Sequence, residues 1–314
     1  METNNVFRLN LKTGSAENYV DPDELFEHCL EKNIIGVGWS VDEPVNSIEE
    51  WIKEGEKKYN SRSFIRAANN MNRIEEDDLI WIRNHGTYYL CRAEGKAKIE
   101  YDKEHDLFCV VQVCIARIGT MEKIPAKIRN SFISRSAIQR VYSNTDYNEI
   151  ELISKLLYNN HIKKGEKYSL SNKKVENPVK LLQSETIEEI LGLYLQEQEY
   201  YIFSGTNKLS TQTYEYVAVN KDEPHEKIYT QVKTGGATIN INEFKNILDN
   251  EKDSKLYYYA EEKSNEVASS DYSNRCKYIS PDVLNEFIKA HRKIVPEYVN
   301  ELFDLIDNQS KSES

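Results

Sequence analysis

Short runs of apolar residues, some alternating with polar ones, make up most of the first 140 residues. Such runs, with glycine in the turns between them, are typical of the β-strands of a small barrel. We predict strands at residues 6–11, 34–39, 74–83, 88–93, 98–101 and 108–116. Apolar residues at helical spacing predict helices at 23–33, 47–59 and 63–71. Ser47, followed three residues later by Glu50, is the signature of a capping box at the start of the second helix.

The second half of the chain alternates between helical and strand patterns. In Ser184–Leu195 the apolar residues fall on one helix face, with Glu188 at its edge and Glu189 pointing away. Strands are then predicted at 200–203, 214–219 and 227–233, a helix at 240–250, a strand at 255–259 and a last helix at 281–306. The order from residue 184 to 259 is therefore helix, three strands, helix and strand.

Polar side chains capable of phosphodiester chemistry lie on two neighbouring predicted strands. Gln231 and Lys233 share one strand face, while Val232 points back into the core. Glu215 lies sixteen residues before Gln231, on the preceding strand. A carboxylate and an amide oxygen are the hard ligands that suit Mg²⁺, which can activate water, and a lysine can offset developing negative charge.

This arrangement resembles the PD-(D/E)xK nuclease superfamily, specifically its Mrr-like branch, whose last motif is Q-x-K. The resemblance covers about residues 185–259, and the order of elements there is that of the superfamily core. It implies a mixed sheet flanked by helices, with Glu188, Glu215 and Gln231 contacting Mg²⁺ (or Mn²⁺) or its waters and Lys233 assisting the nucleophile. The family usually has Asp where this chain has Glu215. Glu reaches one methylene further, so an inactive fold kept for binding is the alternative.

Aromatic residues in the first half of the chain could stack on a flipped base. Trp39 follows a strand whose two glycines leave room beside it, and Ser40 and Asp42 just beyond could bond a base edge. Trp81 and Trp51 are further candidates, and the alternative for each aromatic residue is a place in the core. The segment 128–140 holds residues suited to phosphate contacts, or to an ordinary solvated face, namely Arg129, Asn130 and Arg135.

The first half resembles the PUA-like barrels, the group that contains the EVE and YTH domains. The segments that carry the resemblance are Ile35–Trp39, Asp78–Arg83 and Tyr88–Gly95, within about residues 5–142. Domains of this group commonly read a modified base in nucleic acid through an aromatic pocket. The resemblance therefore implies base recognition by this half of the chain.

Composition and charge narrow the function classes. The net charge of −11 argues against a uniformly basic nucleic-acid binder, but residues 117–180 hold thirteen Lys and Arg against six Asp and Glu. A basic middle segment can follow phosphates, or it can be an ordinary solvated face. No apolar run is long enough to span a membrane. The five cysteines form no C-x-x-C pair, which favours reduced thiols in a cytoplasmic protein.

We therefore predict an α+β and α/β chain of two domains. Residues 1–142 form a PUA-like barrel for modified-base recognition, 143–177 a connecting helix and Lys-rich linker, and 178–314 a Mrr-like nuclease domain. The predicted function is a Mg²⁺-dependent DNA endonuclease of a prokaryotic, modification-dependent restriction-like defence system. The alternatives are an inactive module that binds nucleic acid or a partner, and a nuclease for RNA or single strands. Two cuts, one per strand, favour a homodimer, and the lack of a P-loop motif leaves any motor to a separate partner protein.

Overall fold

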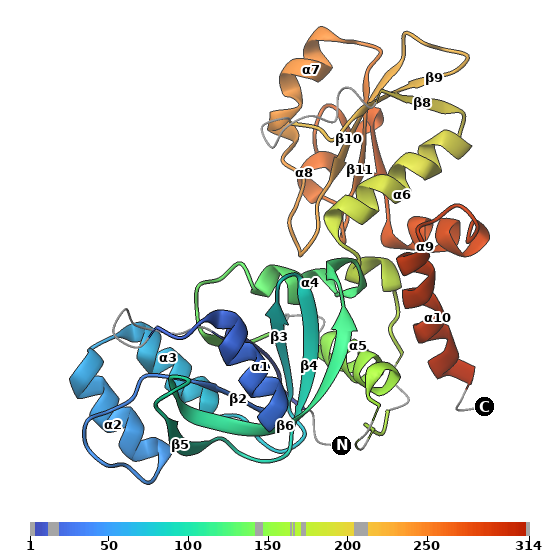
Figure 1. The fold of residues 1–314 in the computed structure, drawn as a ribbon. Helices are drawn as coiled ribbons and strands as arrows, with labels where there is room; N and C mark the ends of the chain where they lie inside the picture. Colours follow the sequence, from blue (N-terminus) through green and yellow to red (C-terminus); the bar gives the residue numbers. More distant parts are fainter. Residues whose placement is uncertain are drawn as a thin grey trace. The chain divides into compact units, whose positions relative to one another are not determined.

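A computed structural model describes residues 4–11, 19–141, 147–163, 165, 167–170, 174–203 and 213–311. The chain divides into two compact units, which are described separately below (Figure 1). The first unit is Met1–Val175 with Leu305–Ser314, and the second unit is Glu176–Asp304. Within the described residues, no helix has the length and apolar character needed to cross a membrane.

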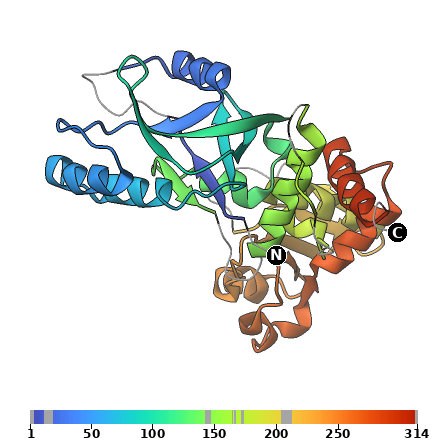
Figure 2. The same cartoon turned by 90° about the horizontal axis from the view of Figure 1, so that it is seen from below.

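The first unit is built on a mixed sheet that curls strongly into a half-barrel (Figure 2). Its strands are β1 (Val6–Leu9), β2 (Ile34–Val37), β3 (Leu79–Asn84), β4 (Thr87–Ala93), β5 (Lys98–Asp102), β6 (Leu107–Gly119) and β7 (Ile138–Arg140). The order is β2-β6-β4-β3-β1-β7, with β5 also paired to β6. Strands β1 and β3 run parallel, and the other pairs are antiparallel. The predicted run of short strands is confirmed, as a half-barrel.

The helices of the first unit are α1 (Pro22–Lys32), α2 (Ile48–Tyr59), α3 (Arg62–Met71), α4 (Ala126–Ser131) and α5 (Tyr147–His161). The Ser47 half of the predicted capping box is confirmed, since Ser47 accepts from the Glu50 N–H, whereas the Glu50 side chain accepts from the N–H of Asn46, one residue before the cap. Helices α2 and α3 pack so closely that a Cβ at Gly55 would lie 2.0 Å from the ring of Phe64. Only glycine therefore fits at this position.

The second unit holds a five-stranded mixed sheet of order β12-β11-β10-β9-β8. Its strands are β8 (Tyr200–Phe203), β9 (Val217–Asn220), β10 (Lys227–Val232), β11 (Lys255–Tyr259) and β12 (Cys276–Ile279). Strands β10, β11 and β12 run parallel, whereas β8, β9 and β10 are antiparallel. The helices are α6 (Ser184–Glu197), α7 (Lys245–Asn250), α8 (Asn265–Ala268), α9 (Pro281–Ala290) and the first part of α10 (Glu297–Lys311), whose residues from Leu305 on belong to the first unit. The predicted α+β class with a mixed sheet and flanking helices is confirmed.

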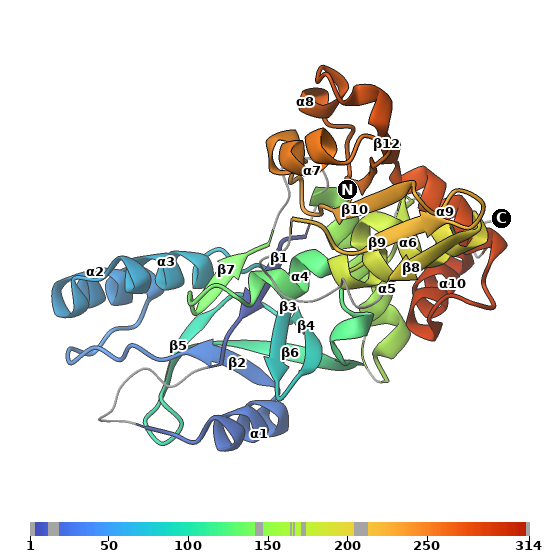
Figure 3. The same cartoon turned by 90° about the horizontal axis from the view of Figure 1, so that it is seen from above.

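Helices lie on both sides of the second sheet (Figure 3). Its central strands are buried on both faces, so alternate residues of one strand enter different clusters. On β11, Tyr257 and Tyr259 pack with residues of α6 and α9, whereas Leu256 and Tyr258 pack with residues of α7 and α8. A strand buried on both faces explains why its sequence is almost continuously apolar and aromatic.

Three predicted elements differ from the structure. The predicted strand at 214–219 is regular only in β9, because residues 213–215 bend. The predicted last helix at 281–306 is two helices, since Pro296, just before α10, has no N–H to donate and disfavours helical geometry in the residue before it. The predicted helix at 240–250 is a 3₁₀ turn, Ile241–Glu243, followed by α7.

The linker predicted at 143–177 is partly anchored in the first unit. Residues 142–146, 164, 166 and 171–173 lie outside the described residues. Tyr168 is buried, and its hydroxyl donates to the carbonyl oxygen of Asp77 at 2.8 Å. The side chain of Asn159, on α5, bonds both the N–H and the carbonyl oxygen of Tyr168. The described middle of the linker therefore packs against its own unit.

Candidate functional site

The bend before β9 brings Glu215 beside β10. The Glu215 N–H donates to the carbonyl oxygen of Thr230 at 2.8 Å, and the Thr230 N–H donates to the carbonyl oxygen of Tyr216 at 3.1 Å. These bonds hold Glu215 next to Gln231, which follows Thr230 on the strand. The Gln231 amide donates to the Glu215 carboxylate at 2.6 Å, and the Gln231 side chain is only 6% exposed. Two of the predicted metal ligands are thus in direct contact.

Glu188 approaches the same place from α6, which lies along the sheet in Figure 1. The Tyr216 hydroxyl donates to the main-chain carbonyl oxygen of Glu188 at 3.3 Å and ties the helix to the bent segment. The Glu188 side chain is half-buried, whereas its neighbour Glu189 is exposed, as the helical pattern predicts. Burial and the nearby carboxylates of Glu215 and Glu185 raise the pKa of Glu188 to about 7.

Lys233 completes the group from the end of β10. Its N–H donates to the carbonyl oxygen of Tyr259 at 3.0 Å, which extends the pairing with β11 by one residue. The Lys233 side chain is half-buried, and Val232 before it is buried in the core as predicted. Burial raises the pKa of Glu215, while a bond from the Val232 backbone and the Lys233 ammonium lower it. The structure therefore brings together Glu188, Glu215, Gln231 and Lys233.

This donor set suits a hard divalent cation. Two half-buried carboxylates whose charges repel would both be stabilised by a cation between them. Gln231 at present turns its amide N–H toward Glu215. Its carbonyl oxygen would face a cation held by Glu215 once the amide rotates by half a turn. Glu185, one helical turn before Glu188, is the acidic residue here that the sequence reasoning missed, although its i, i+3 spacing marks it.

The segment after β2 carries the predicted base-recognition residues Trp39 and Ser40. Trp39 has a left-handed φ of 63°, and its half-buried ring packs edge-on against Phe64. The carbonyl oxygen of Trp39 accepts from the Trp51 indole at 2.9 Å. The carbonyl oxygen of Ser40 accepts from the Tyr59 hydroxyl at 2.6 Å. The backbone of Trp39 and Ser40 is therefore held from α2.

The other two tryptophans are core residues. Trp81 is completely buried, and its indole donates to the Ser154 hydroxyl at 3.1 Å. Trp51 is also completely buried. Both rings are enclosed because their strand and helix positions face the core, so neither presents a face on which a base could stack in this structure.

The predicted phosphate-contact residues lie on α4 and the loop that follows it. Arg129 is half-buried, whereas Asn130 and Arg135 are exposed. Sequence reasoning missed the residue that supports this loop, Arg8 on β1. Arg8 stands between two apolar core residues in a strand, so the period-two pattern places its side chain on the other sheet face.

Arg8 is completely buried and binds the backbone of the loop. Its guanidinium donates to the carbonyl oxygens of Ser131 at 2.9 Å and Ser134 at 3.3 Å, to that of Ser136, and to the side chain of Gln139 at 3.0 Å. Burial and the neighbouring guanidinium of Arg83 lower the pKa of Arg8 to about 10. This buried cation, together with the Asn10 amide, which donates to the carbonyl oxygens of Ser134 at 3.4 Å and Ser136 at 3.1 Å, holds the loop that carries Arg135.

Comparison with protein-family models, with curated proteins and with solved structures finds no match to this chain.

Proposed function

We propose that this chain is a metal-dependent endodeoxyribonuclease of a modification-dependent, restriction-like defence system in a prokaryotic cytoplasm. The observation that carries the proposal is the group formed by Glu188, Glu215, Gln231 and Lys233. These residues come from a helix and from the facing ends of two strand segments. Their order and spacing along the chain also support the resemblance to the Mrr-like nucleases.

Each member of the group has a distinct role in the proposed reaction. A bound Mg²⁺ or Mn²⁺ would polarise the scissile phosphoryl group and lower the pKa of a coordinated water. Glu188, Glu215 and Gln231 would hold the cation and orient its waters through their oxygens. The Lys233 ammonium would position the attacking water and offset the negative charge that develops on the phosphoryl oxygens.

The first unit would read the DNA. Trp39 and Ser40 lie on a segment held by α2, which would give a flipped base a fixed surface. Arg129, Asn130 and Arg135 would contact phosphates. Trp81 would not contact the base, because its side chain is enclosed in the core. Two cuts, one on each strand, favour a homodimer, and any motor activity would come from a separate partner protein.

The rival proposal is a binding module without catalysis. It is favoured by Glu215, which stands where the family usually has the shorter Asp. Against this rival, the bend before β9 brings the Glu215 carboxylate into contact with Gln231, although the Glu side chain is one methylene longer than that of Asp. A third reading keeps the same site but directs it at RNA or at single strands.

A digestion panel tests the proposal. The full chain is incubated with phage DNAs that carry different cytosine or adenine modifications, with unmodified plasmid, with single-stranded DNA and with RNA. Each substrate is tested in Mg²⁺, in Mn²⁺ and in excess EDTA. We expect cleavage of a modified duplex that requires the cation. Cleavage that persists in EDTA contradicts the metal mechanism, and a chain that cuts none of these substrates is a binding module.

A further inference from the structure

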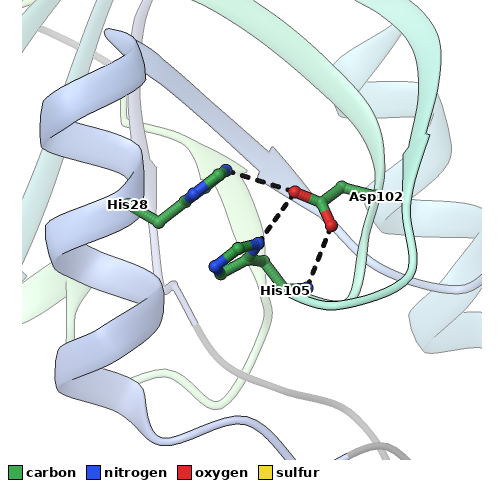
Figure 4. Close-up of side chains that lie close together, drawn as sticks. All are labelled: His28, Asp102 and His105. Atoms are coloured by element: carbon green, nitrogen blue, oxygen red, sulfur yellow. Dashed lines mark hydrogen bonds and ion pairs between the residues drawn. The ribbon is translucent and has the colours of Figure 1, made fainter.

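Two histidines and an aspartate of the first unit converge on one oxygen atom (Figure 4). His28 lies on α1, whereas Asp102 and His105 lie at the hairpin between β5 and β6. The Nε2 atom of His28 is 3.2 Å from Asp102 Oδ2, and the Nδ1 atom of His105 is 2.8 Å from the same oxygen. All three side chains are partly exposed, by 14 to 30%.

The carboxylate of Asp102 is held in place by the hairpin itself. Its Oδ1 atom accepts from the backbone N–H groups of Glu104 at 3.0 Å and His105 at 3.1 Å. These bonds fix the turn and leave Oδ2 facing the two imidazoles. A carboxylate with one oxygen bonded to the protein and the other directed at two histidine nitrogens is typical of metal ligands with a supporting outer shell.

We propose that His28, Asp102 and His105 bind one divalent transition-metal ion of the Zn²⁺ class. Their ligand atoms all lie within 4.8 Å of one another. With metal–ligand distances of about 2.0–2.1 Å, the ligand atoms of a tetrahedral site are separated by about 3.3–3.4 Å. The observed separation of 3.2 Å needs to open by about 0.1–0.2 Å, and that of 2.8 Å by about 0.5–0.6 Å. Imidazole nitrogens favour Zn²⁺, Cu²⁺, Ni²⁺ or Co²⁺ over Mg²⁺.

Metal binding requires one movement. The two imidazole rings are stacked, with centroids 3.5 Å apart and an angle of 16° between their planes. A metal binds in the plane of an imidazole ring, so one ring must turn out of this stack for both nitrogens to face the same ion. The two nitrogens that now face Asp102 Oδ2 would lose their protons and bind the metal. Each neutral ring would then carry its proton on the other nitrogen.

The fourth coordination position would be taken by water. The neighbouring thiol, Cys29, is completely buried in the apolar cluster beneath α1. The three ligand side chains are partly exposed, so water can reach the fourth position from the solvent side. The loaded site would join α1 to the hairpin between β5 and β6. It shares no residue with the group around Glu215, so it is independent of the proposed nuclease.

Cobalt titration of the full chain tests this site, because the visible absorption of Co²⁺ is strong in a four-coordinate protein site and weak for the hydrated ion. In excess Mg²⁺, which would occupy the group around Glu215, we expect one Co²⁺ bound per chain, displaced by Zn²⁺ and not by Mg²⁺. His28→Ala and Asp102→Asn should each weaken binding by about a hundredfold or more. The matched control is His85→Ala, which removes an exposed histidine that pairs with Asp23 at 2.6 Å. This variant should bind Co²⁺ as the wild-type chain does.

A second set of measurements separates this site from the nuclease group. Glu215→Gln should keep the full Co²⁺ absorption, since its carboxylate belongs to the other unit. Circular dichroism of His28→Ala and Asp102→Asn should match the wild type and show that the variants fold. The proposal is overturned if the wild-type chain binds no Co²⁺ at micromolar concentrations. It is also overturned if folded His28→Ala binds as tightly as wild type, or if Glu215→Gln abolishes the absorption.

Discussion

At Glu188, burial and like charge act in the same direction on one carboxyl group. Both favour the neutral acid, so the folded pKa of about 7 lies above the ordinary value of 4.5. The folded state therefore binds this proton more tightly than the unfolded state does. The stability linked to Glu188 is fully present below about pH 4.5 and is lost as the pH rises through about 7.

The Glu188→Gln variant tests this linkage. In EDTA, the substitution removes a group that is costly to ionise, so it should raise the melting temperature at pH 8 and change it little at pH 4. The measurement is the melting temperature of both proteins across this range. Glu189→Gln, on the exposed side of α6, is the control and should show no such trend. Parallel curves for wild type and Glu188→Gln would contradict the pKa shift.

Lys233 should matter for cleavage and little for folding. Lys233→Ala removes a half-buried charge near Glu215, and cleavage should fall by about a hundredfold or more. Glu215→Gln should have a similar effect. DNA affinity should fall only slightly for Lys233→Ala, because other phosphate contacts remain. Plasmid cleavage and binding are compared with those of Glu189→Gln, which should cut nearly as wild type. Full activity in the first two variants would refute the nuclease proposal.

The loop after α4 is held by side chains from a distant part of the sequence, chiefly that of Arg8. Arg8 donates to the carbonyl oxygens of Ser131 and Ser134, and the Asn10 side chain also donates to that of Ser134. The loop's shape is therefore set from β1, more than a hundred residues away in sequence. The backbone position of the exposed Arg135 is thereby fixed as well.

Arg8→Lys tests this support. A lysine keeps the charge but cannot reach several carbonyl oxygens at once, so the free energy of unfolding should fall by about 2–4 kcal/mol. Urea unfolding of the two proteins measures the change. Arg66→Lys, on the exposed side of α3, makes the same chemical change where no such network exists, and its unfolding curve should stay at the wild-type position. Equal curves for all three proteins would show that the bonds to the loop contribute nothing.

Elements defined by their own residues could be predicted from the sequence, and those defined by partners could not. The strand at Lys255–Tyr259 is found where it was predicted, because its apolar run is bounded by polar turns. The parallel pairing of β1 with β3 joins segments about seventy residues apart, which no local pattern encodes. For the candidate site, strand alternation correctly placed Val232 in the core. The contact between Glu215 and Gln231 depends on a bend that appears only in the fold.

At the scale of the whole molecule, the chain divides into two compact units, while the domain bounds and functions assigned from the sequence stay predictions. The segment that was predicted as a linker belongs to the first unit and combines polar residues with the buried Tyr168. The rate at which a protease cuts this segment should therefore depend on the packing and the hydrogen bond of Tyr168.

Limited trypsin digestion tests this dependence. The first cut should fall within residues 163–174, and Tyr168→Ala should accelerate it, since the substitution removes the bond to Asp77 and the packing of the ring. Tyr19→Ala is the matched control, because Tyr19 is 70% exposed, and its digestion rate should not change. Early cuts inside Val217–Val232 would show that the boundary is wrongly placed.

The close fit of Gly55 against Phe64 restricts which substitutions this sequence can accept during evolution, and in which order. Glycine inside a helix is normally the first position at which a mutation to alanine increases stability. Here the added methyl group of alanine would clash with the phenyl ring of Phe64. Gly55 can therefore be replaced by alanine only after Phe64 has been replaced by a smaller residue. Positions 55 and 64 must change in a fixed order, and a lineage that starts from this sequence tends to keep both residues.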